Sequence, residues 1–167
     1  MESASSYLFE FFIIFLLIFF NALFVATEYA IVRVRSSEVE ALMKQGTAGV
    51  KDVKDIINNL DKYISSTQLG ITIVNLLLGW IGEDIFVKLL HPLFAMTTLS
   101  KPIVNTLSVI IGLGIITYFT ITIGELAPKA IAIKNYKKIT VWFAKPLKIF
   151  YLVFKPFIWL LNKSANL

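Results

Sequence analysis

The run Phe11-Phe-Ile-Ile-Phe-Leu-Leu-Ile-Phe-Phe20 is a block of ten consecutive apolar residues. It lies within a longer apolar segment, residues 7–32. A hydrocarbon core of about 30 Å is crossed by roughly 20 helical residues, so this segment is long enough to span a bilayer. No basic residue precedes it and it is longer than the apolar core of a signal peptide, which favours a retained membrane helix.

Two further segments, residues 63–90 and 103–133, pass the same length test. The 167-residue chain is 57% hydrophobic and contains fourteen phenylalanines, unlike the composition of a soluble globular domain. We therefore predict an all-α polytopic membrane protein, in which residues 1–136 form a transmembrane domain with three transmembrane helices.

Lys and Arg residues are distributed unevenly around the three predicted spans. None precedes the first span, six lie between the first and the second, two lie in the next connection, and eight follow from Lys129 onward. Since short cytoplasmic segments carry the excess of basic residues, we expect the N-terminus outside and the C-terminus in the cytoplasm. The short loop expected around His91 and Pro92 would then lie outside. This pattern predicts a multi-pass protein of the plasma membrane.

Residues 36–62, between the first two spans, are predicted to form a cytosolic helical hairpin. Ser37 and Glu40 have the spacing of a capping box, and Gly46 is placed to end the first helix. We expect the apolar stripe of the second helix to pack on the membrane surface or on a neighbouring element. That stripe has helical spacing: Val50, Val53, Ile57 and Leu60.

Residues 137–167 are apolar enough to cross a membrane but carry Lys145, Lys148 and Lys155 along their length. Each central lysine would cost about 2.5 to 3.5 kcal/mol, so we predict a juxtamembrane interfacial helix instead of a fourth span. The Lys-Pro pairs at 145–146 and 155–156 are expected to bend it. Its lysines would face anionic headgroups beside a belt of aromatic residues: Trp142, Phe150, Tyr151, Phe154, Phe157 and Trp159.

The composition excludes several classes of function. The chain has no cysteine and one histidine, His91, so thiolate and poly-histidine metal sites within one chain are excluded. The net charge is +5, but the basic residues flank apolar spans, which favours the lipid bilayer with its anionic headgroups over nucleic acid as the partner. The sequence has no pairing of a nucleophile with a base and no phosphate-binding loop, so we expect no enzymatic activity.

The segment Gly124-Glu-Leu-Ala-Pro-Lys129 places a carboxylate and a proline inside the third apolar segment. Because proline lacks a backbone N–H, Pro128 leaves the carbonyl of Gly124, four residues earlier, without its helical donor. We expect a helix break at Pro128 and Lys129, with a free carbonyl beside Glu125. Hard oxygen atoms next to a disrupted membrane helix are typical of cation sites in transporters.

Three polar residues are predicted to lie in the inner half of the membrane. Counting inward from the cytosolic end of each span at about 1.5 Å per residue places Asn75 at roughly 18 Å, Glu125 at roughly 13 Å and Glu28 at roughly 7 Å. With the Gly124 carbonyl they offer the all-oxygen shell that suits Mg²⁺ or Na⁺. Nearby hydroxyl groups could complete this shell: Thr27, Ser66, Thr67, Thr72 and Thr122.

Each of these groups also has a structural interpretation. Asn75 could join two helices through a hydrogen bond, and Glu28 could form an ion pair with Arg33 or Arg35 at the inner interface. Serine and threonine hydroxyls in membrane helices mostly bond to their own turn. Glu125 lies deeper and beside the backbone break, which favours ligation. Glycines on the second and third spans are expected to permit close helix contact: Gly70, Gly79, Gly82, Gly112 and Gly114.

Three motifs occur in a fixed order along the predicted spans. They are Phe24-Val-Ala-Thr-Glu-Tyr-Ala30, then Ser66-Thr-Gln-Leu-Gly-Ile-Thr-Ile-Val-Asn75, then Gly124-Glu-Leu-Ala-Pro-Lys129. In order and spacing they closely resemble the transmembrane domain of the CorC/CorB magnesium transporters and of the animal cyclin M (CNNM) proteins. The resemblance covers nearly the whole chain, and the third motif is its most specific part.

The resemblance implies a homodimer that binds a dehydrated Mg²⁺ in an acidic, inward-facing cavity. It also implies Mg²⁺ export coupled to inward Na⁺ movement. By motif position, the cation ligands would be Asn75, the Gly124 carbonyl and Glu125. Dimerisation would bury the glycine-bearing faces of the second and third spans.

This chain departs from the family pattern on the first span. Many relatives have Phe-Ser-Gly near the start of the first motif, whereas this chain has Val25 followed by Ala26. Thr27 or Glu28 would then have to supply the ligand from the first span. The resemblance further implies cytosolic CBS modules after residue 167, so we expect this chain to be a piece of a longer protein.

The sequence thus predicts a magnesium transporter domain with Asn75, Gly124 and Glu125 at its centre. One alternative stays open: a membrane anchor and dimerisation module that presents cytosolic regulatory domains. In that interpretation the polar residues serve only to hold helices together.

Overall fold

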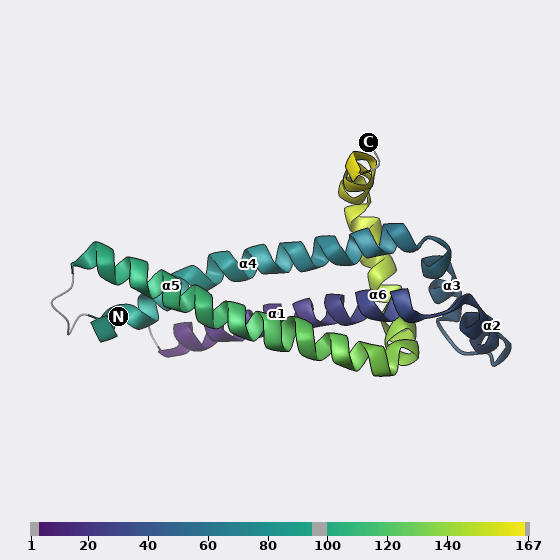
Figure 1. The fold of residues 1–167 in the computed structure, drawn as a ribbon, viewed down its shortest axis with the longest axis horizontal. Coiled ribbons are helices and arrows are strands. Elements are labelled where there is room, and N and C mark those ends of the chain that lie inside the picture. Colours follow the sequence, from purple (N-terminus) through teal and green to yellow (C-terminus); the bar gives the residue numbers. More distant parts are fainter. Residues whose placement is uncertain (1–3, 95–99, 166–167) are drawn as a thin grey trace.

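The computed structural model describes residues 4–94 and 100–165, and these residues form helices and short connections without any strand. The predicted all-α architecture is therefore confirmed. Three long helices run side by side along the molecule, two short helices cap one end, and the last helix crosses the bundle near that end (Figure 1). The helices are α1 (Ala4–Arg33), α2 (Ser36–Lys44), α3 (Val50–Asn58), α4 (Leu60–Phe94), α5 (Lys101–Phe119), the π-helix η1 (Thr120–Leu126) and α6 (Ala127–Ala165).

The long helices α1, α4 and α5 pack through a mostly aliphatic core. Helix α4 contacts both α1 and α5, and α1 also contacts η1, the continuation of α5. Two glycines permit the close approach of α4 and α5: a Cβ on Gly82 would collide with the Ile116 side chain, and one on Gly112 with that of Phe86. The core side chains of this part come from all three helices: Ile14, Ile18, Val74, Leu78, Ile85, Phe86 and Ile116.

Two segments of the described chain are long and apolar enough to cross a membrane, Leu8–Arg33 and Lys101–Ser164. Large apolar side chains on the surface of α1 fit a lipid environment, with Phe9, Phe12 and Phe15 between 59% and 67% exposed. Helix α4 has the length to cross, but it carries charged residues towards both ends and is not among these two segments. The count of three spans stays a prediction.

The third predicted span is interrupted differently from our expectation. The chain does not leave the helical path at Pro128; it widens into η1 one turn before the proline. The backbone N–H of Ala127 bonds to the carbonyl of Thr122, five residues earlier, as in a π-helix. The extra residue in the turn shifts the hydrogen-bond register ahead of Pro128, and the helix then continues as α6.

Helices α2 and α3 occupy the segment predicted as a cytosolic helical hairpin and contact each other, while the cytosolic hairpin itself stays a prediction. Gly46 ends α2 as expected, with φ of 69°, because a left-handed residue lets the last carbonyls of the helix be satisfied. The N–H groups of Gly46 and Thr47 bond to the carbonyls of Met43 and Leu42 in a Schellman motif. The predicted Ser37–Glu40 capping box is wrong: the N-cap of α2 is Arg35, two residues before Ser37, and Glu38 accepts a hydrogen bond from the Arg35 N–H.

Helix α6 contains the predicted juxtamembrane helix. Its backbone departs from helical geometry at Asn135, where φ is −118° and ψ is 23°. After this kink the helix turns across the bundle near the end that α2 and α3 cap (Figure 1). Pro146 and Pro156 lie inside α6, where the backbone keeps helical dihedral angles, so the expected division at the two Lys-Pro pairs does not occur.

The apolar stripe of the hairpin packs on α6. Val50, Val53 and Ile56 of α3 form a buried cluster with Ala144 and Leu147 of α6. This settles the choice that the sequence left open, between a neighbouring element and the membrane surface. Helix α4 then starts at Leu60 and stays helical through His91 and Pro92 to Phe94, so the loop expected around these two residues is wrong. A single proline in the last turn removes only one backbone hydrogen bond.

Candidate functional site

A pocket of about 220 Å³ lies between α4 and the α5–η1 segment. It brings together two residues predicted to bind a cation, Asn75 of α4 and Glu125 of η1. Two threonines that the sequence analysis did not single out, Thr117 and Thr120, also line it. The remaining wall is apolar and comes from the same helices: Leu78, Gly79, Leu113, Ile116 and Ile121.

Two of these polar side chains have oxygen atoms without a partner. Asn75 Oδ1 and Thr120 Oγ1 are buried and accept or donate no hydrogen bond among the described residues. Buried polar atoms are nearly always paired, because an unpaired group loses its hydration without replacement. An unpaired carboxamide oxygen and an unpaired hydroxyl oxygen in one pocket are the donors that a hard cation would use.

Glu125 is half-buried and forms no ion pair with any lysine of the described segments. Its neighbour Lys129 instead places its Nζ 4.6 Å from the centre of the Tyr29 ring on α1. The carboxylate therefore lines the pocket without a compensating cation from the described residues. A negative charge in an apolar setting is costly unless something neutralises it.

Gly124 is buried, but its carbonyl is not free. Asn21 of α1 donates a hydrogen bond from Nδ2 to the Gly124 oxygen at 3.3 Å. A Cβ on Gly124 would lie 2.9 Å from the same Nδ2, so glycine is needed for this approach. The sequence analysis missed Asn21, although a lone carboxamide directly after the apolar run of residues 11–20 is a detectable signal.

Asn21 itself is fully buried, and its Oδ1 has no partner within the described chain. The Asn21 side chain lies on the face of α1 that contacts η1. It does not line the pocket of Asn75 and Glu125, so it is a polar contact between the first and third predicted spans.

The other predicted ligands lie outside the pocket. Thr27 donates to the Leu23 carbonyl at 2.7 Å, and Thr72, which is exposed, donates to the Gln68 carbonyl at 2.8 Å. Glu28 accepts a hydrogen bond from the Thr67 hydroxyl at 3.1 Å. Thr27 and Thr72 therefore have a structural role, because each hydroxyl bonds to a carbonyl of its own helical turn.

The described residues show no ion pair between Glu28 and Arg33 or Arg35; Arg33 lies over the Tyr136 ring at 5.2 Å. Pro128 is buried and follows η1 directly. No group of three or more His, Cys, Asp or Glu side chains that could hold a metal occurs in the described ranges. A cation in the pocket would thus be bound by one carboxylate and by neutral oxygen atoms.

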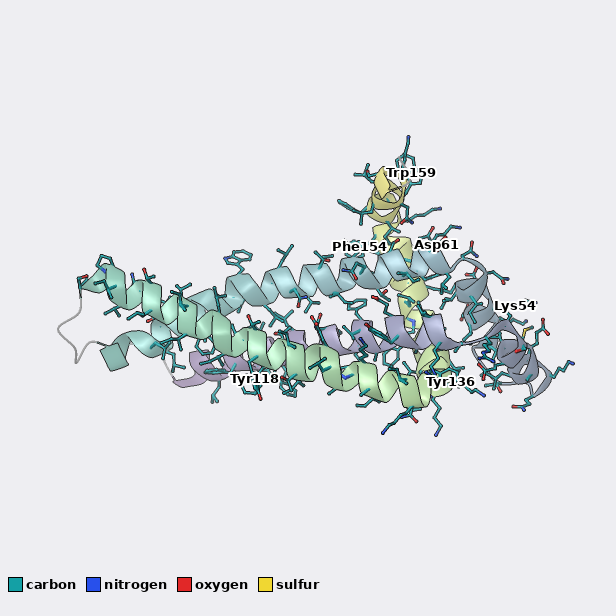
Figure 2. The ribbon with its side chains drawn as sticks, in the orientation of Figure 1. Lys54, Asp61, Tyr118, Tyr136, Phe154 and Trp159 are labelled. Atoms are coloured by element: carbon teal, nitrogen blue, oxygen red, sulfur yellow. The ribbon has the colours of Figure 1, made fainter. Side chains whose placement is uncertain are left out.

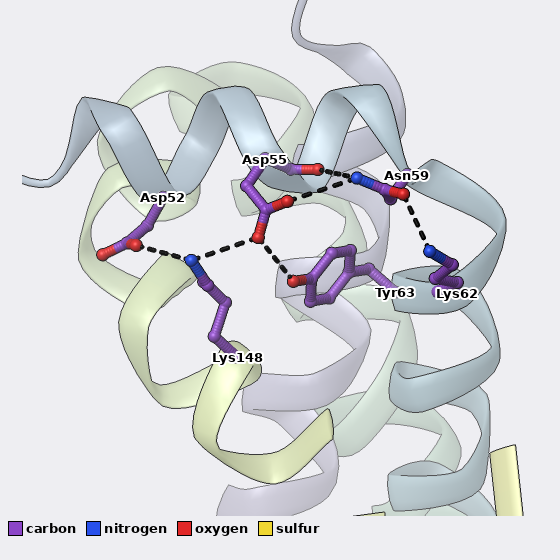
Figure 3. Close-up of polar contacts among 6 residues, drawn as sticks. All are labelled: Asp52, Asp55, Asn59, Lys62, Tyr63 and Lys148. Atoms are coloured by element: carbon purple, nitrogen blue, oxygen red, sulfur yellow. Dashed lines mark hydrogen bonds and ion pairs between the residues drawn. The ribbon is translucent and has the colours of Figure 1, made fainter. Parts of the chain in front are cut away.

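A second polar network fixes the hairpin to α6 (Figure 3). Lys148 of α6 binds Asp52 at 2.8 Å and Asp55 at 3.1 Å, both on α3. Tyr63 of α4 donates its hydroxyl to Asp55 at 3.0 Å. Burial would raise the pKa of Asp55, but hydrogen bonds from Lys148 and Tyr63 outweigh it and lower the pKa. Lys148 was expected to face lipid headgroups; it binds the hairpin instead.

Long apolar helices, a helix that crosses one end of them and a pocket between α4 and η1 define an α-helical membrane domain. Residues 12–167 match the family described as the cyclin M transmembrane N-terminal domain, and the chain belongs to this family. The resemblance found from the three motifs is thus confirmed.

Curated relatives extend well beyond the length of this chain. It is 46% identical over 151 residues to UPF0053 protein YrkA of Bacillus subtilis, covering 90% of this chain and 35% of that protein. It is 44% identical to UPF0053 protein YugS of the same organism, covering 92% and 36%. Identity to UPF0053 protein sll0260 of Synechocystis is 30%, covering 98% and 36%. The chain spans about a third of the length of these relatives.

Proposed function

We propose that this domain transports Mg²⁺ across the membrane through the pocket between α4 and η1. The cation is the cargo, bound in passage by Asn75, Thr120 and Glu125. The observation that carries the proposal is the meeting of two unpaired buried oxygens, Asn75 Oδ1 and Thr120 Oγ1, with an uncompensated carboxylate in one pocket. The membrane-domain family of the chain is consistent with metal-ion transport.

The chemistry of the pocket favours a hard divalent cation. All its polar groups are oxygen donors, and the chain has no cysteine to attract a softer metal. One carboxylate and two neutral oxygens leave coordination positions for water or for a backbone carbonyl, as Mg²⁺ tolerates. The Gly124 carbonyl would join this shell if Asn21 released it or shared it.

The π-helix offers a means to change the access of the pocket. A π-turn holds one residue more than an α-turn, so its register can shift by one residue without breaking the helix. Such a shift would rotate Glu125 relative to Asn75. We propose that this motion, driven by inward Na⁺ movement, exports Mg²⁺ from the cytoplasm, with no enzymatic step. The domain would sit in the plasma membrane with its N-terminus outside.

We further propose a homodimer. A Cβ added at Gly79 or Gly114 would meet no atom within 4 Å, whereas Gly70, Gly82 and Gly112 lie against side chains of their own chain. Leu76 and Trp80 on the same helix as Gly79 are 70% and 76% exposed. This face of α4 is therefore suited to contact with a second copy.

The test compares Mg²⁺ binding with Mg²⁺ flux in the full chain. Millimolar Mg²⁺ should raise the melting temperature, because a ligand that binds only the folded state stabilises it. Glu125→Gln should abolish the rise, and the matched variant Glu40→Gln, at an exposed position on α2, should retain it. In proteoliposomes with an imposed Na⁺ gradient, the wild type should move Mg²⁺ in the direction opposite to the flow of Na⁺.

A membrane anchor and dimerisation module is the alternative. It is favoured by the rigid attachment of the hairpin to α6 through Lys148, Asp52 and Asp55. An anchor would show no Mg²⁺-dependent stabilisation and no flux while still forming a dimer. If Glu125→Gln and Glu40→Gln respond to Mg²⁺ equally, the pocket is not the binding site.

A further inference from the structure

The inner end of α4 and the second half of α6 enclose a groove of about 470 Å³, here called the α4–α6 groove. Two lysines, Lys62 and Lys155, and two aromatic residues, Tyr151 and Trp159, line it. A groove of this size can hold a polar headgroup. It is separate from the pocket of Asn75 and Glu125, with which it shares no lining residue.

Contacts on both sides of the groove fix its two helices together. The rings of Tyr63 on α4 and Tyr151 on α6 are 5.3 Å apart. The Ser65 hydroxyl of α4 donates to Asn162 Oδ1 of α6. Ile158, at 1% exposure, forms the buried floor. The groove is therefore a built feature of the helix crossing.

Neither lysine of the groove forms an ion pair within the described residues, although Asp55 attracts Lys62 electrostatically. Lys62 Nζ donates to the neutral Asn59 Oδ1 at 2.9 Å, while the carboxylate of the same network, Asp55, binds Lys148 (Figure 3). The adjacent Asp61 does not line the groove. Lys155 forms no ion pair within the described residues, and residues 127–165 contain no Asp or Glu.

The surroundings of the groove are strongly apolar. Phe157, Trp159 and Leu160 on α6 are 62%, 61% and 56% exposed. Figure 2 shows Phe154 and Trp159 on the part of α6 that extends beyond the bundle. Paired cations beside an exposed aromatic and aliphatic surface suit a molecule that has an anionic head and apolar tails.

We propose that the α4–α6 groove binds an anionic phospholipid of the inner leaflet. Lys62 and Lys155 contact the phosphate group, and the acyl chains lie along the exposed apolar face of α6. The proposal rests on the proposed interfacial placement of α6 and does not depend on Mg²⁺ transport. A free phosphate would use the two lysines but gain nothing from Trp159 and its apolar neighbours.

The test uses Trp159 as its reporter. Replacing Trp80 and Trp142 by Phe leaves Trp159 as the only tryptophan of the three in the chain. The full chain is placed in two kinds of phosphatidylcholine vesicle. One contains brominated phosphatidylglycerol and the other contains brominated phosphatidylcholine. Quenching of Trp159 fluorescence is measured in both. We expect preferential quenching by the brominated phosphatidylglycerol, and no change on adding inorganic phosphate.

Two double variants separate the site from general charge. Lys62→Gln with Lys155→Gln should lower the preference for phosphatidylglycerol, by roughly fivefold per lysine. Lys51→Gln with Lys145→Gln removes two exposed lysines outside the groove and should leave the preference unchanged. An equal loss in both double variants, or equal quenching by both brominated lipids, would overturn the proposal.

Two further outcomes would also overturn it. Displacement of the quenching lipid by inorganic phosphate would show a site for free anions. The absence of quenching by either lipid would show that protein covers the groove, either a second copy or a cytosolic segment of a longer chain. Mg²⁺-dependent stabilisation, measured on the same samples, reports separately on the proposed transport site.

Discussion

Asn21 and Gly124 are 103 residues apart in sequence, and their buried side-chain amide and carbonyl form a hydrogen bond of 3.3 Å. The bond joins the middle of α1 to the π-helix of the third predicted span. It uses a carbonyl that Pro128 would leave without a donor in a regular α-helix. Asn21 of α1 thereby stabilises the π-helical geometry of η1.

Asn21→Ala should lower the stability of the protein by about 1 to 2 kcal/mol, because the Gly124 carbonyl loses its buried donor. The free energy of unfolding in detergent solution measures this loss. Asn58→Ala, at an exposed position on α3, is the control and should change stability by less than about 0.5 kcal/mol. Equal effects of both variants would mean that the Asn21 contact contributes nothing specific.

Gly112→Ala should be destabilising by about 1 to 3 kcal/mol, because the new methyl group would collide with the Phe86 side chain and force α5 away from α4. Gly114→Ala adds the same methyl group two residues along the same helix, where no atom lies within 4 Å. Unfolding of both variants as monomers is the measurement. Equal destabilisation would contradict the observed packing of α4 on α5.

The attachment of α2 to α6 should depend on pH. Hydrogen bonds from Lys137, Tyr136 and the Arg35 N–H lower the pKa of Glu38 from 4.5 to about 2. Since the folded pKa is the lower one, the contribution of Glu38 is fully present above pH 4.5 and is lost as the pH falls from 4.5 towards 2. The rate of pepsin cleavage within the hairpin should rise across this range.

Two variants check that this pH dependence comes in part from Glu38. Glu38→Gln should show a smaller rise across the window than the wild type, since one titrating group is gone while Asp55, whose pKa is also lowered, still titrates. Glu40→Gln removes a carboxylate on the same helix that makes no ion pair in the described part of the chain, and it should keep the rise. An unchanged profile in Glu38→Gln would assign the pH dependence to another group.

The helices could be predicted from the sequence because they depend on local signals. Apolar runs of the right length indicated the long helices, and Gly46 marked the end of α2. The cost of lysine in a bilayer separated residues 137–167 from the spans, and the structure puts the kink nearby, at Asn135. The partners of Lys148 could not be predicted, because they are distant in sequence. Asp52, for example, is 96 residues away from Lys148.

The candidate site was predictable only in part. Asn75 and Glu125 were expected together and line one pocket. Thr120 and Asn21 were missed, because whether a polar group is unpaired or bonded to a distant helix depends on tertiary packing. The π-turn was missed for a related reason: Pro128 indicates a disturbed hydrogen-bond register but does not say in which direction the helix adapts.

The network at Lys148 allows a direct measurement of coupling. A double-mutant cycle with Asp55→Asn and Lys148→Gln should give an interaction energy of about 0.5 to 1 kcal/mol, since both side chains are partly exposed. The free energy of unfolding of the four proteins supplies the cycle. A parallel cycle with Asp61→Asn, an exposed residue that forms no ion pair with Lys148, should give an interaction energy near zero.

Thr120 lacks the hydrogen bond that most threonines of the bundle form, a property that it shares with Thr140 of α6. Thr27, Thr72 and Thr106 each donate to a carbonyl four residues earlier, whereas Thr120 Oγ1 is buried without a partner in the described chain. A hydroxyl that forms no bond in the folded protein costs stability, because its hydration is lost on burial. Binding of another group to the Thr120 hydroxyl for part of the time would reduce this loss of stability.

Thr120→Val should therefore separate stability from Mg²⁺ binding. Valine keeps the shape but removes the unpaired oxygen, so without Mg²⁺ the melting temperature should stay the same or rise. The increase caused by millimolar Mg²⁺ should become smaller, because the cation loses a ligand. Thr106→Val, at an exposed position on α5, is the matched control and should keep the full increase. A full Mg²⁺ response in Thr120→Val would remove this hydroxyl from the proposed cation shell and leave Asn75 and Glu125 to bind the cation.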